Sequence, residues 1–225
     1  MPKKAILLDF YGTTVHEDGL CINQICKAVS QSCKQPRRVE DISAFWWKIY
    51  CSLFTNASGK RFITKKQIIL MSLQKTIQFF ESSENAEKLV QSIYRHWQAP
   101  PIFDEVKTFF AKSPVPICIV SNSDREDIQS AIIHHELLPE TFVTSQDAKC
   151  YKPDSVIFQH ALNCLSLTKD EVIFIGDSIT CDVVGATKAG IDVIWLNRAK
   201  KPISHYLDSD MVCSNLLEVL AKDLF

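Results

Sequence analysis

Four groups of polar residues in this 225-residue chain could do chemistry, since each borders a short apolar run or a predicted helix start. They are residues 9–14 (Asp-Phe-Tyr-Gly-Thr-Thr), residues 121–123 (Ser-Asn-Ser), the pair Lys152 and Pro153, and residues 176–178 (Gly-Asp-Ser) with Asp182. Carboxylates are ligands that magnesium prefers, and an aspartate whose charge a cation offsets can act as a nucleophile. Serine, asparagine and lysine can hold phosphoryl oxygens and stabilise developing negative charge. The set predicts phosphoryl chemistry if the fold brings the groups together.

Each group alone also has an ordinary structural interpretation. An aspartate after a strand, such as Asp9 or Asp177, is most often a solvated strand end or a helix cap. A Lys-Pro pair is usually a surface turn, and a Ser-Asn pair commonly caps a helix. The functional interpretation therefore depends on the order of the groups and on their shared position at strand ends, where ligands bind in open α/β sheets.

The elements that would position these groups are short strands alternating with helices. Apolar runs typical of buried parallel strands occupy residues 5–10, 115–120, 172–175 and 192–196, and residues 141–144 are a shorter candidate. Helical patterns follow at residues 124–135 and 182–189. This alternation predicts an α/β fold with a Rossmann-like, doubly wound parallel sheet.

A different pattern occupies the stretch between the first two predicted strands. Residues 21–99 contain almost no glycine, and apolar residues such as Ile42, Trp46 and Ile49 recur there at helical spacing. The pair Pro100-Pro101 then ends the helical pattern. We therefore predict a core that an α-helical cap domain interrupts, with the core at residues 1–18 and 101–225 and the cap at residues 19–100.

Composition narrows the class of partner. The formal net charge is -1, which gives no indication of nucleic acid or of an anionic membrane as a partner. The first apolar run is interrupted at Asp9, too early for a signal segment or a spanning helix, so we expect a cytoplasmic protein. The nine cysteines form no C-x-x-C pair, and we expect them to be reduced, mostly as small buried hydrophobes. The oligomeric state stays open.

Taken together, the motifs resemble the haloacid dehalogenase-like hydrolases over essentially the whole chain. The matching positions are Asp9-x-Tyr11-Gly12-Thr13, Ser121-Asn122, Tyr151-Lys152-Pro153-Asp154, and Gly176-Asp177-Ser178 followed by Asp182. The resemblance implies a Rossmann-like core and a mobile cap in the insert. It also implies a covalent intermediate on the nucleophilic aspartate, which is an aspartyl phosphate in the phosphatases.

The same resemblance assigns roles to single residues. It implies that Mg²⁺ binds Asp9, the backbone carbonyl of Tyr11, and Asp177. Asp9, Tyr11, Lys152 and Asp182 form the expected catalytic set, and Thr13, Ser121, Asn122 and Lys152 are the expected substrate-binding set. The preferred function is a magnesium-dependent phosphatase that acts on a small soluble metabolite.

Tyr11 departs from the phosphatase pattern. Phosphatases of this family usually carry a second aspartate at this position, which serves as general acid and then as base. A phenol with an ordinary pKa of about 10 is a poor base at neutral pH. His16 and Glu17 could supply a proton, although both are more typical of a surface loop.

Three alternatives follow from Tyr11. Tyrosine here is typical of 2-haloacid dehalogenases, but those enzymes have an arginine where this chain has Trp47, and they lack the Gly-Asp-Ser motif. Phosphonoacetaldehyde hydrolases share the run at residues 12–15 but need a cap lysine, and we expect Lys60, Lys65 and Lys66 to be exposed to solvent. A pseudo-hydrolase kept for binding is the third alternative. Trp46, Trp47 and Tyr50 could line a pocket, although core packing is the commoner role of such residues.

Overall fold

The computed structural model describes residues 2–202 and 209–225, so positions 1 and 203–208 of the predicted core lie outside the description. A six-stranded sheet in the order β3-β2-β1-β4-β5-β6 forms the core, and all neighbouring strands in it are parallel. The strands are β1 (Ala5–Leu8), β2 (Ile117–Ser121), β3 (Thr141–Thr144), β4 (Val172–Gly176), β5 (Asp192–Leu196) and β6 (Val212–Cys213). The five predicted strands are confirmed, whereas β6 has only two residues and is too short to produce a periodic pattern.

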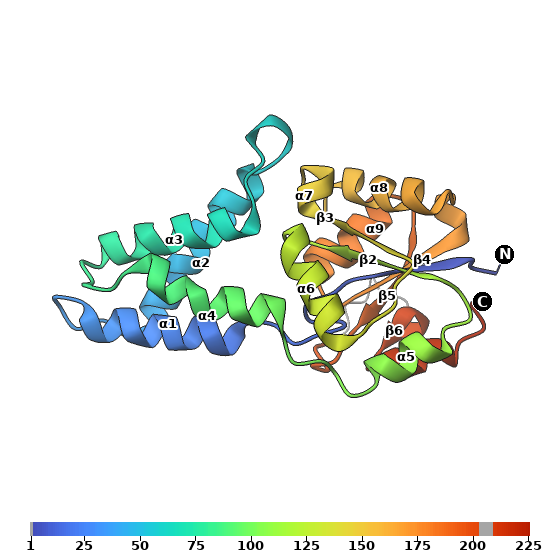
Figure 1. The fold of residues 1–225 in the computed structure, drawn as a ribbon, viewed down its shortest axis with the longest axis horizontal. Coiled ribbons are helices and arrows are strands. Elements are labelled where there is room, and N and C mark those ends of the chain that lie inside the picture. Colours follow the sequence, from blue (N-terminus) through green and yellow to red (C-terminus); the bar gives the residue numbers. More distant parts are fainter. Residues whose placement is uncertain (1, 203–208) are drawn as a thin grey trace.

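Helices cover both faces of the sheet, which confirms the doubly wound α/β fold. Ile6 and Leu8 of β1 pack on one face against α5 (Val106–Lys112), α6 (Arg125–His135) and α10 (Leu216–Leu220). Ala5 and Leu7 point to the other face, against α8 (Ser155–Leu165) and α9 (Val184–Lys188). Successive strand side chains point to opposite faces, so a strand covered on both sides is apolar throughout. In Figure 1, α8 and α9 lie on one side of the sheet and α5 on the other.

Short helical elements complete the core among the described residues. They are α7 (Ser145–Ala148), the 3-10 turns η2 (Lys169–Glu171) and η4 (Ser209–Met211), and the π-helical turn η3 (Ile179–Val183) that carries Asp182. No helix of the described residues is both long and apolar enough to span a membrane.

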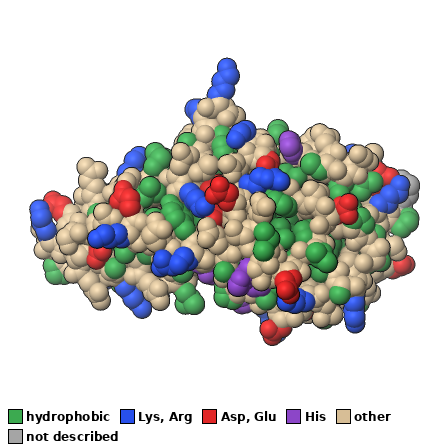
Figure 2. All heavy atoms as spheres, viewed as in Figure 1, with side chains coloured by type: hydrophobic (Ala, Val, Ile, Leu, Met, Phe, Trp, Pro, Cys, Tyr) green, Lys and Arg blue, Asp and Glu red, His purple; other side chains and the backbone are tan. Residues whose placement is uncertain are grey.

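The inserted segment between β1 and α5 forms a bundle of four helices beside the sheet (Figure 1). Its elements are α1 (Gly19–Ser32), α2 (Val39–Asn56), the 3-10 turn η1 (Gly59–Arg61), α3 (Lys65–Phe79) and α4 (Ala86–Gln98). The bundle has a hydrophobic cluster of its own, in which Ile42, Trp46, Leu73 and Trp97 are buried. Basic and acidic side chains are mixed over the face of the molecule in Figure 2, in keeping with a net charge near zero.

The start of α3 is docked on the core through polar contacts. The Asp124 carboxylate accepts hydrogen bonds from the backbone N–H groups of Lys65 and Lys66, at 2.9 Å each. The Lys66 ammonium lies 2.9 Å from the buried Asp127 carboxylate on α6. Because the first N–H groups of a helix have no partner inside the helix, Asp124 satisfies part of α3 from outside the bundle.

Candidate active site

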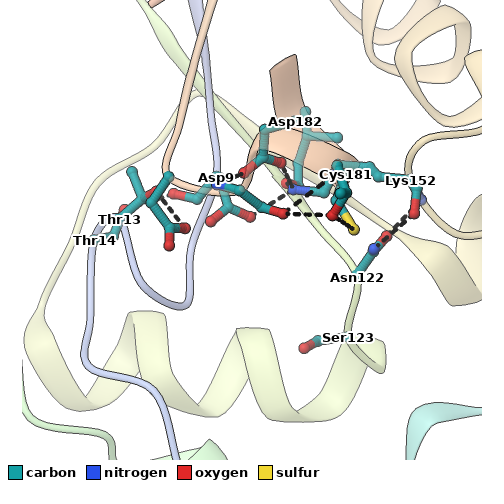
Figure 3. A network of polar contacts seen from close by, with 12 residues as sticks. Asp9, Thr13, Thr14, Asn122, Ser123, Lys152, Cys181 and Asp182 are labelled. Atoms are coloured by element: carbon teal, nitrogen blue, oxygen red, sulfur yellow. Dashed lines mark hydrogen bonds and ion pairs between the residues drawn. The ribbon is translucent and has the colours of Figure 1, made fainter. Parts of the chain in front are cut away.

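Three aspartates meet at the carboxyl end of the sheet. Asp9 follows β1 and Asp177 follows β4, and these two strands are neighbours in the sheet. Asp182 comes from the π-helical turn after β4. One carboxylate oxygen from each of Asp9, Asp177 and Asp182 lies within 4.8 Å of the others. Figure 3 shows Asp9 and Asp182 pointing toward one another across this edge.

Lys152 supplies the positive charge at the centre of this group. Its buried ammonium donates to the Asp9 Oδ1 atom at 2.5 Å, to the Asp182 Oδ1 atom at 2.7 Å and to the Val120 carbonyl at 3.0 Å. Burial alone would lower the pKa of Lys152, but the two carboxylates outweigh it and raise that pKa, so the lysine stays cationic.

The site nevertheless has more negative than positive charge. Burial and the neighbouring Asp9 and Asp182 carboxylates raise the pKa of Asp177. Burial also raises the pKa of Asp182, against the opposing effect of Lys152. Three carboxylates face one lysine, and a divalent cation would offset the remaining charge. An all-oxygen set of hard donors fits magnesium.

Glycines allow the backbone to approach these carboxylates closely. Gly12 has a φ of +90°, and a Cβ atom there would lie 2.6 Å from Asp177 Oδ1. A Cβ atom on Gly176 would lie 2.5 Å from Asp182 Cγ. Any larger residue at Gly12 would be strained and would collide with the carboxylate, so the loop after β1 needs glycine to reach Asp177.

The predicted substrate-binding residues divide into two groups. Ser121 and Asn122 line the same cavity as Asp9 and Lys152. Asn122 also fixes the Lys152 backbone, because it accepts from Lys152 N at 2.6 Å and donates to Lys152 O at 3.1 Å. Thr13 is instead buried, and its hydroxyl donates to Asp177 Oδ1 at 3.3 Å. Its contact is therefore with a carboxylate of the cluster.

The Tyr11 hydroxyl is engaged with the helical bundle. It donates to the backbone carbonyl of Trp97 in α4 at 2.5 Å. Burial, together with the negative charges of Asp127 and Asp18, raises the pKa of Tyr11 well above its ordinary value. The phenol therefore stays protonated, and its proton points to a main-chain oxygen of α4.

A cavity of about 500 Å³ lies between the carboxylates and the bundle. The bundle contributes Trp47, Tyr50, Cys51, Phe54, Thr55 and Lys65 to its wall. Of the three aromatic residues singled out in the sequence, Trp46 packs in the bundle core, whereas Trp47 and Tyr50 line the cavity. Glu17 also lines the cavity, while His16 packs against Phe103.

The expectation that all three cap lysines are exposed is wrong for Lys65 and Lys66. Lys60 is exposed, but Lys65 and Lys66 are half-buried. The capping box of Thr64 and Gln67 starts α3 at Lys65, and Asp124 of the core holds that end. The Thr-x-x-Gln capping signal can be read in the sequence. The contact with Asp124 cannot, because it joins residues that are 59 positions apart.

The cysteines differ in burial. All nine are free in the structure, and Cys26, Cys118, Cys150 and Cys213 are buried. The other five are half-buried or exposed, and Cys51 and Cys181 line the cavity.

Comparison with known proteins identifies the family. The profile of the haloacid dehalogenase-like hydrolases matches residues 3–190. The chain belongs to this family. It is therefore a hydrolase, and the family match covers the aspartate cluster and Lys152 as well as the helical bundle.

Relatives of this hydrolase include both phosphatases and a dehalogenase. The phosphoserine phosphatase of Thermus thermophilus is 26% identical over 148 residues, which cover 62% of this chain and 58% of the relative. The (S)-2-haloacid dehalogenase 4A of Burkholderia cepacia is 27% identical over 153 residues, 64% of each chain. The mouse N-acylneuraminate-9-phosphatase is 22% identical over 157 residues, which cover 62% of this chain and 62% of the relative. The hydrolase thus spans less than two thirds of each of these relatives.

Solved structures share the fold over nearly the whole hydrolase. The L-2-haloacid dehalogenase of Xanthobacter autotrophicus superposes with a TM-score of 0.75 at 17% identity, over 99% of this chain and all of the other. The magnesium-bound HAD-hydrolase YfnB of Bacillus subtilis superposes with a TM-score of 0.75 at 17% identity, over 98% of both chains. At such identities the likeness concerns the fold alone.

Proposed function

We propose that this hydrolase is a magnesium-dependent phosphatase that acts on a small phosphorylated metabolite. The observation that carries the proposal is the group of three carboxylates around one buried lysine. An anionic substrate would meet net negative charge there unless a cation were bound. A bound divalent ion removes this conflict, and phosphate oxygens are among its preferred ligands.

Asp9, Asp177 and the Tyr11 carbonyl are the groups that would hold the ion. When bound, Mg²⁺ supplies positive charge that offsets the carboxylates and the phosphoryl oxygens. Asp182 accepts from Lys152 and from the Ser178 backbone N–H at 2.9 Å, so its role is to fix the lysine and the loop.

Asp9 is the nucleophile of the proposed reaction. Its Oδ1 atom is held by Lys152, which leaves the second carboxylate oxygen to attack phosphorus. A bond from Asp9 to phosphorus forms while the bond to the leaving oxygen breaks, and the electron pair departs with that oxygen. Water then hydrolyses the aspartyl phosphate, which releases inorganic phosphate and restores the carboxylate. Lys152, Ser121 and Asn122 hold the transferring group.

The leaving group receives no proton from Tyr11 in this scheme, because the phenol donates to Trp97. An aryl or acyl phosphate releases a weakly basic oxygen and needs little protonation. An alkyl ester releases a basic alkoxide and needs an acid. The proposed enzyme therefore prefers phosphates with good leaving groups.

The helical bundle is proposed to act as the cap over this site, with residues 19–100 as the cap and residues 1–18 and 101–225 as the core. Its support is the separate hydrophobic cluster of the bundle and the bundle's contribution of one wall of the cavity. Closure of such a cap excludes water and completes the site.

A 2-haloacid dehalogenase is the second candidate, because Tyr11 matches that class. The site offers less support for it. Lys65 and Lys152 are the cations among the residues that line the described cavity, and Trp47 stands where those enzymes have an arginine. An anionic haloacid would also face the uncompensated Asp177 carboxylate.

Trapping with beryllium trifluoride, a phosphate mimic that binds an aspartate oxygen, tests the proposal. We expect a bound ¹⁹F NMR signal that requires Mg²⁺ and is absent in Asp9→Asn. Absence of the signal at saturating Mg²⁺ would favour a binding protein that kept the fold. Hydrolytic activity that survives EDTA would favour the dehalogenase.

A further inference from the structure

Lys65 places a second cation in the active-site cavity, apart from the one that serves the nucleophile. Its ammonium lies 4.4 Å from the centre of the Trp97 ring, 4.8 Å from that of Tyr11, and 3.4 Å from the Ser123 hydroxyl. In the described part of the chain, no carboxylate oxygen lies within 4.0 Å of it. Aromatic faces can support a half-buried cation but do not neutralise it, and the Glu17 carboxylate, which interacts with Lys65 across the same cavity, lies beyond ion-pair distance.

The position of Lys65 is built into the contact between bundle and core. Asp124 accepts from the backbone N–H groups of Lys65 and Lys66, and Asp127 forms an ion pair with the side chain of Lys66. The backbone of Lys65 is therefore fixed by the loop that follows β2. The side chain is directed over the two aromatic rings, where a substrate group in the cavity can reach it.

The hydroxyl that the Lys65 ammonium contacts, that of Ser123, lies apart from the carboxylate cluster. Figure 3 shows Ser123 on the loop after β2, away from the group formed by Asp9, Lys152 and Asp182. Lys152 is already engaged by two carboxylates. Lys65, unlike Lys152, is therefore available to an anionic group of the substrate other than the phosphoryl group at Asp9.

An aromatic wall lies on the bundle side of the same cavity. Trp47, Tyr50 and Phe54 line the cavity from one face of α2. The Trp47 and Tyr50 rings stack at 5.5 Å with an angle of 10° between their planes, and the Tyr50 and Phe54 rings stack at 5.8 Å with an angle of 22°. Trp47 keeps 65% of its surface exposed. This wall is apolar and aromatic with an open edge at Trp47, so an aromatic ring of a substrate can pack against it.

We propose that Lys65 is a specificity-determining residue that binds a second anionic group, on the leaving group of the substrate. The substrate class is then an aryl phosphate that carries a carboxylate or a second phosphate, with its ring against Trp47 and Tyr50. The inference rests on the proposed phosphatase function and adds the chemistry of the leaving group to it.

A matched pair of substrates tests the charge. In 4-carboxyphenyl phosphate and 4-carbamoylphenyl phosphate the shapes are nearly equal, and only the first carries the second anion. We expect the wild type to prefer the carboxylate in kcat/KM by about 10- to 100-fold, the range for a charge-assisted hydrogen bond in a partly enclosed site. Lys65→Met should abolish this preference, and a circular dichroism spectrum equal to that of the wild type shows that the variant is folded.

Two variants control for unrelated effects. Lys60→Met removes an exposed lysine of the same segment and should leave the preference unchanged. Lys65→Arg keeps the charge and should retain most of the preference. In 1,4-phenylene bisphosphate a second phosphate replaces the carboxylate. The substrate whose kcat/KM falls more in Lys65→Met identifies the anion that the site favours.

The aromatic wall has a separate readout. Trp47→Ala should raise KM for both aryl substrates by a similar factor and leave their ratio unchanged. Equal wild-type activity on acid and amide, or a ratio that Lys65→Met does not change, would overturn the role of Lys65 while the phosphatase proposal stands. No hydrolysis of either substrate together with no Mg²⁺-dependent trapping would overturn both.

Discussion

Replacement of Tyr11 by phenylalanine tests the role of this residue with little change in packing. The ring stays against Phe10 and under Lys65, and only the hydroxyl that donates to the Trp97 carbonyl is lost. If the phenol serves the contact with the bundle, Tyr11→Phe lowers stability and leaves the leaving-group preference unchanged. If the phenol is the general acid, the variant loses activity on alkyl esters selectively.

The size of the stability effect follows from the environment of the bond. A typical intramolecular hydrogen bond contributes about 0.5–1.5 kcal/mol, and an orphaned buried acceptor costs about 1–3 kcal/mol. The bond between the Tyr11 hydroxyl and the Trp97 carbonyl is part-buried, so we expect a loss of about 0.5–1.5 kcal/mol in the free energy of unfolding, measured by urea denaturation. Tyr94→Phe is the matched control, because its hydroxyl donates to Lys66 O at 3.2 Å within the bundle and does not line the cavity.

The kinetic assay compares kcat/KM for aryl and alkyl phosphates in the wild type and the variants. General acid catalysis is worth about 10²–10⁴ in rate, so its absence should favour aryl over alkyl esters by about 10²-fold or more. We expect Tyr11→Phe to keep that ratio. Tyr11→Asp should raise activity on alkyl esters more than on aryl esters, because it places a carboxyl group where family phosphatases carry one.

Equal wild-type activity on the two ester classes would refute this account. In that case Glu17 is the candidate acid, because it lines the cavity and its pKa is raised, mainly by burial and by Asp18. Glu17→Gln would then remove activity on alkyl esters. A selective loss of alkyl activity in Tyr11→Phe would instead identify the phenol itself as the acid.

Three other perturbations have defined outcomes. Asp177→Asn should abolish Mg²⁺-dependent turnover and weaken Mg²⁺ binding in calorimetry, with an unchanged circular dichroism spectrum, because an amide is a weaker ligand than a carboxylate. If the bundle is a mobile cap, hydrogen exchange around residues 18–19 and 100–101 should slow when Mg²⁺ and a phosphate mimic bind, and unchanged exchange would indicate a fixed insert. Burial raises the pKa of Glu105, but hydrogen bonds from its own backbone and from Arg198 lower it more, so its contribution to stability is present at neutral pH and is lost as the pH falls below about 4. Glu105→Gln should therefore lower the free energy of unfolding at pH 7 by about 1–2 kcal/mol, which urea denaturation would show as a lower midpoint. The difference from the wild type should shrink at pH 3.

Local sequence determined the fold class and the position of the candidate site. A run such as residues 172–175 is apolar throughout because a strand covered on both faces has no solvent side, and that pattern is visible without coordinates. Asp9 and Asp177 were identifiable for a related reason. They follow neighbouring parallel strands, whose carboxyl ends share one edge of the sheet.

Tertiary structure alone decided which neighbouring side chains face the cavity. Trp46 and Trp47 are adjacent in the sequence, yet one is buried in the bundle and the other lines the site. A helix turns about 100° per residue, so the faces are assigned only when the partner of each face is known. The sequence left the surroundings of the Tyr11 phenol and of the Lys65 ammonium undetermined for the same reason. Their environments come from Trp97, 86 residues from Tyr11, and from Asp124, 59 residues from Lys65, and local sequence carries no record of such distant contacts.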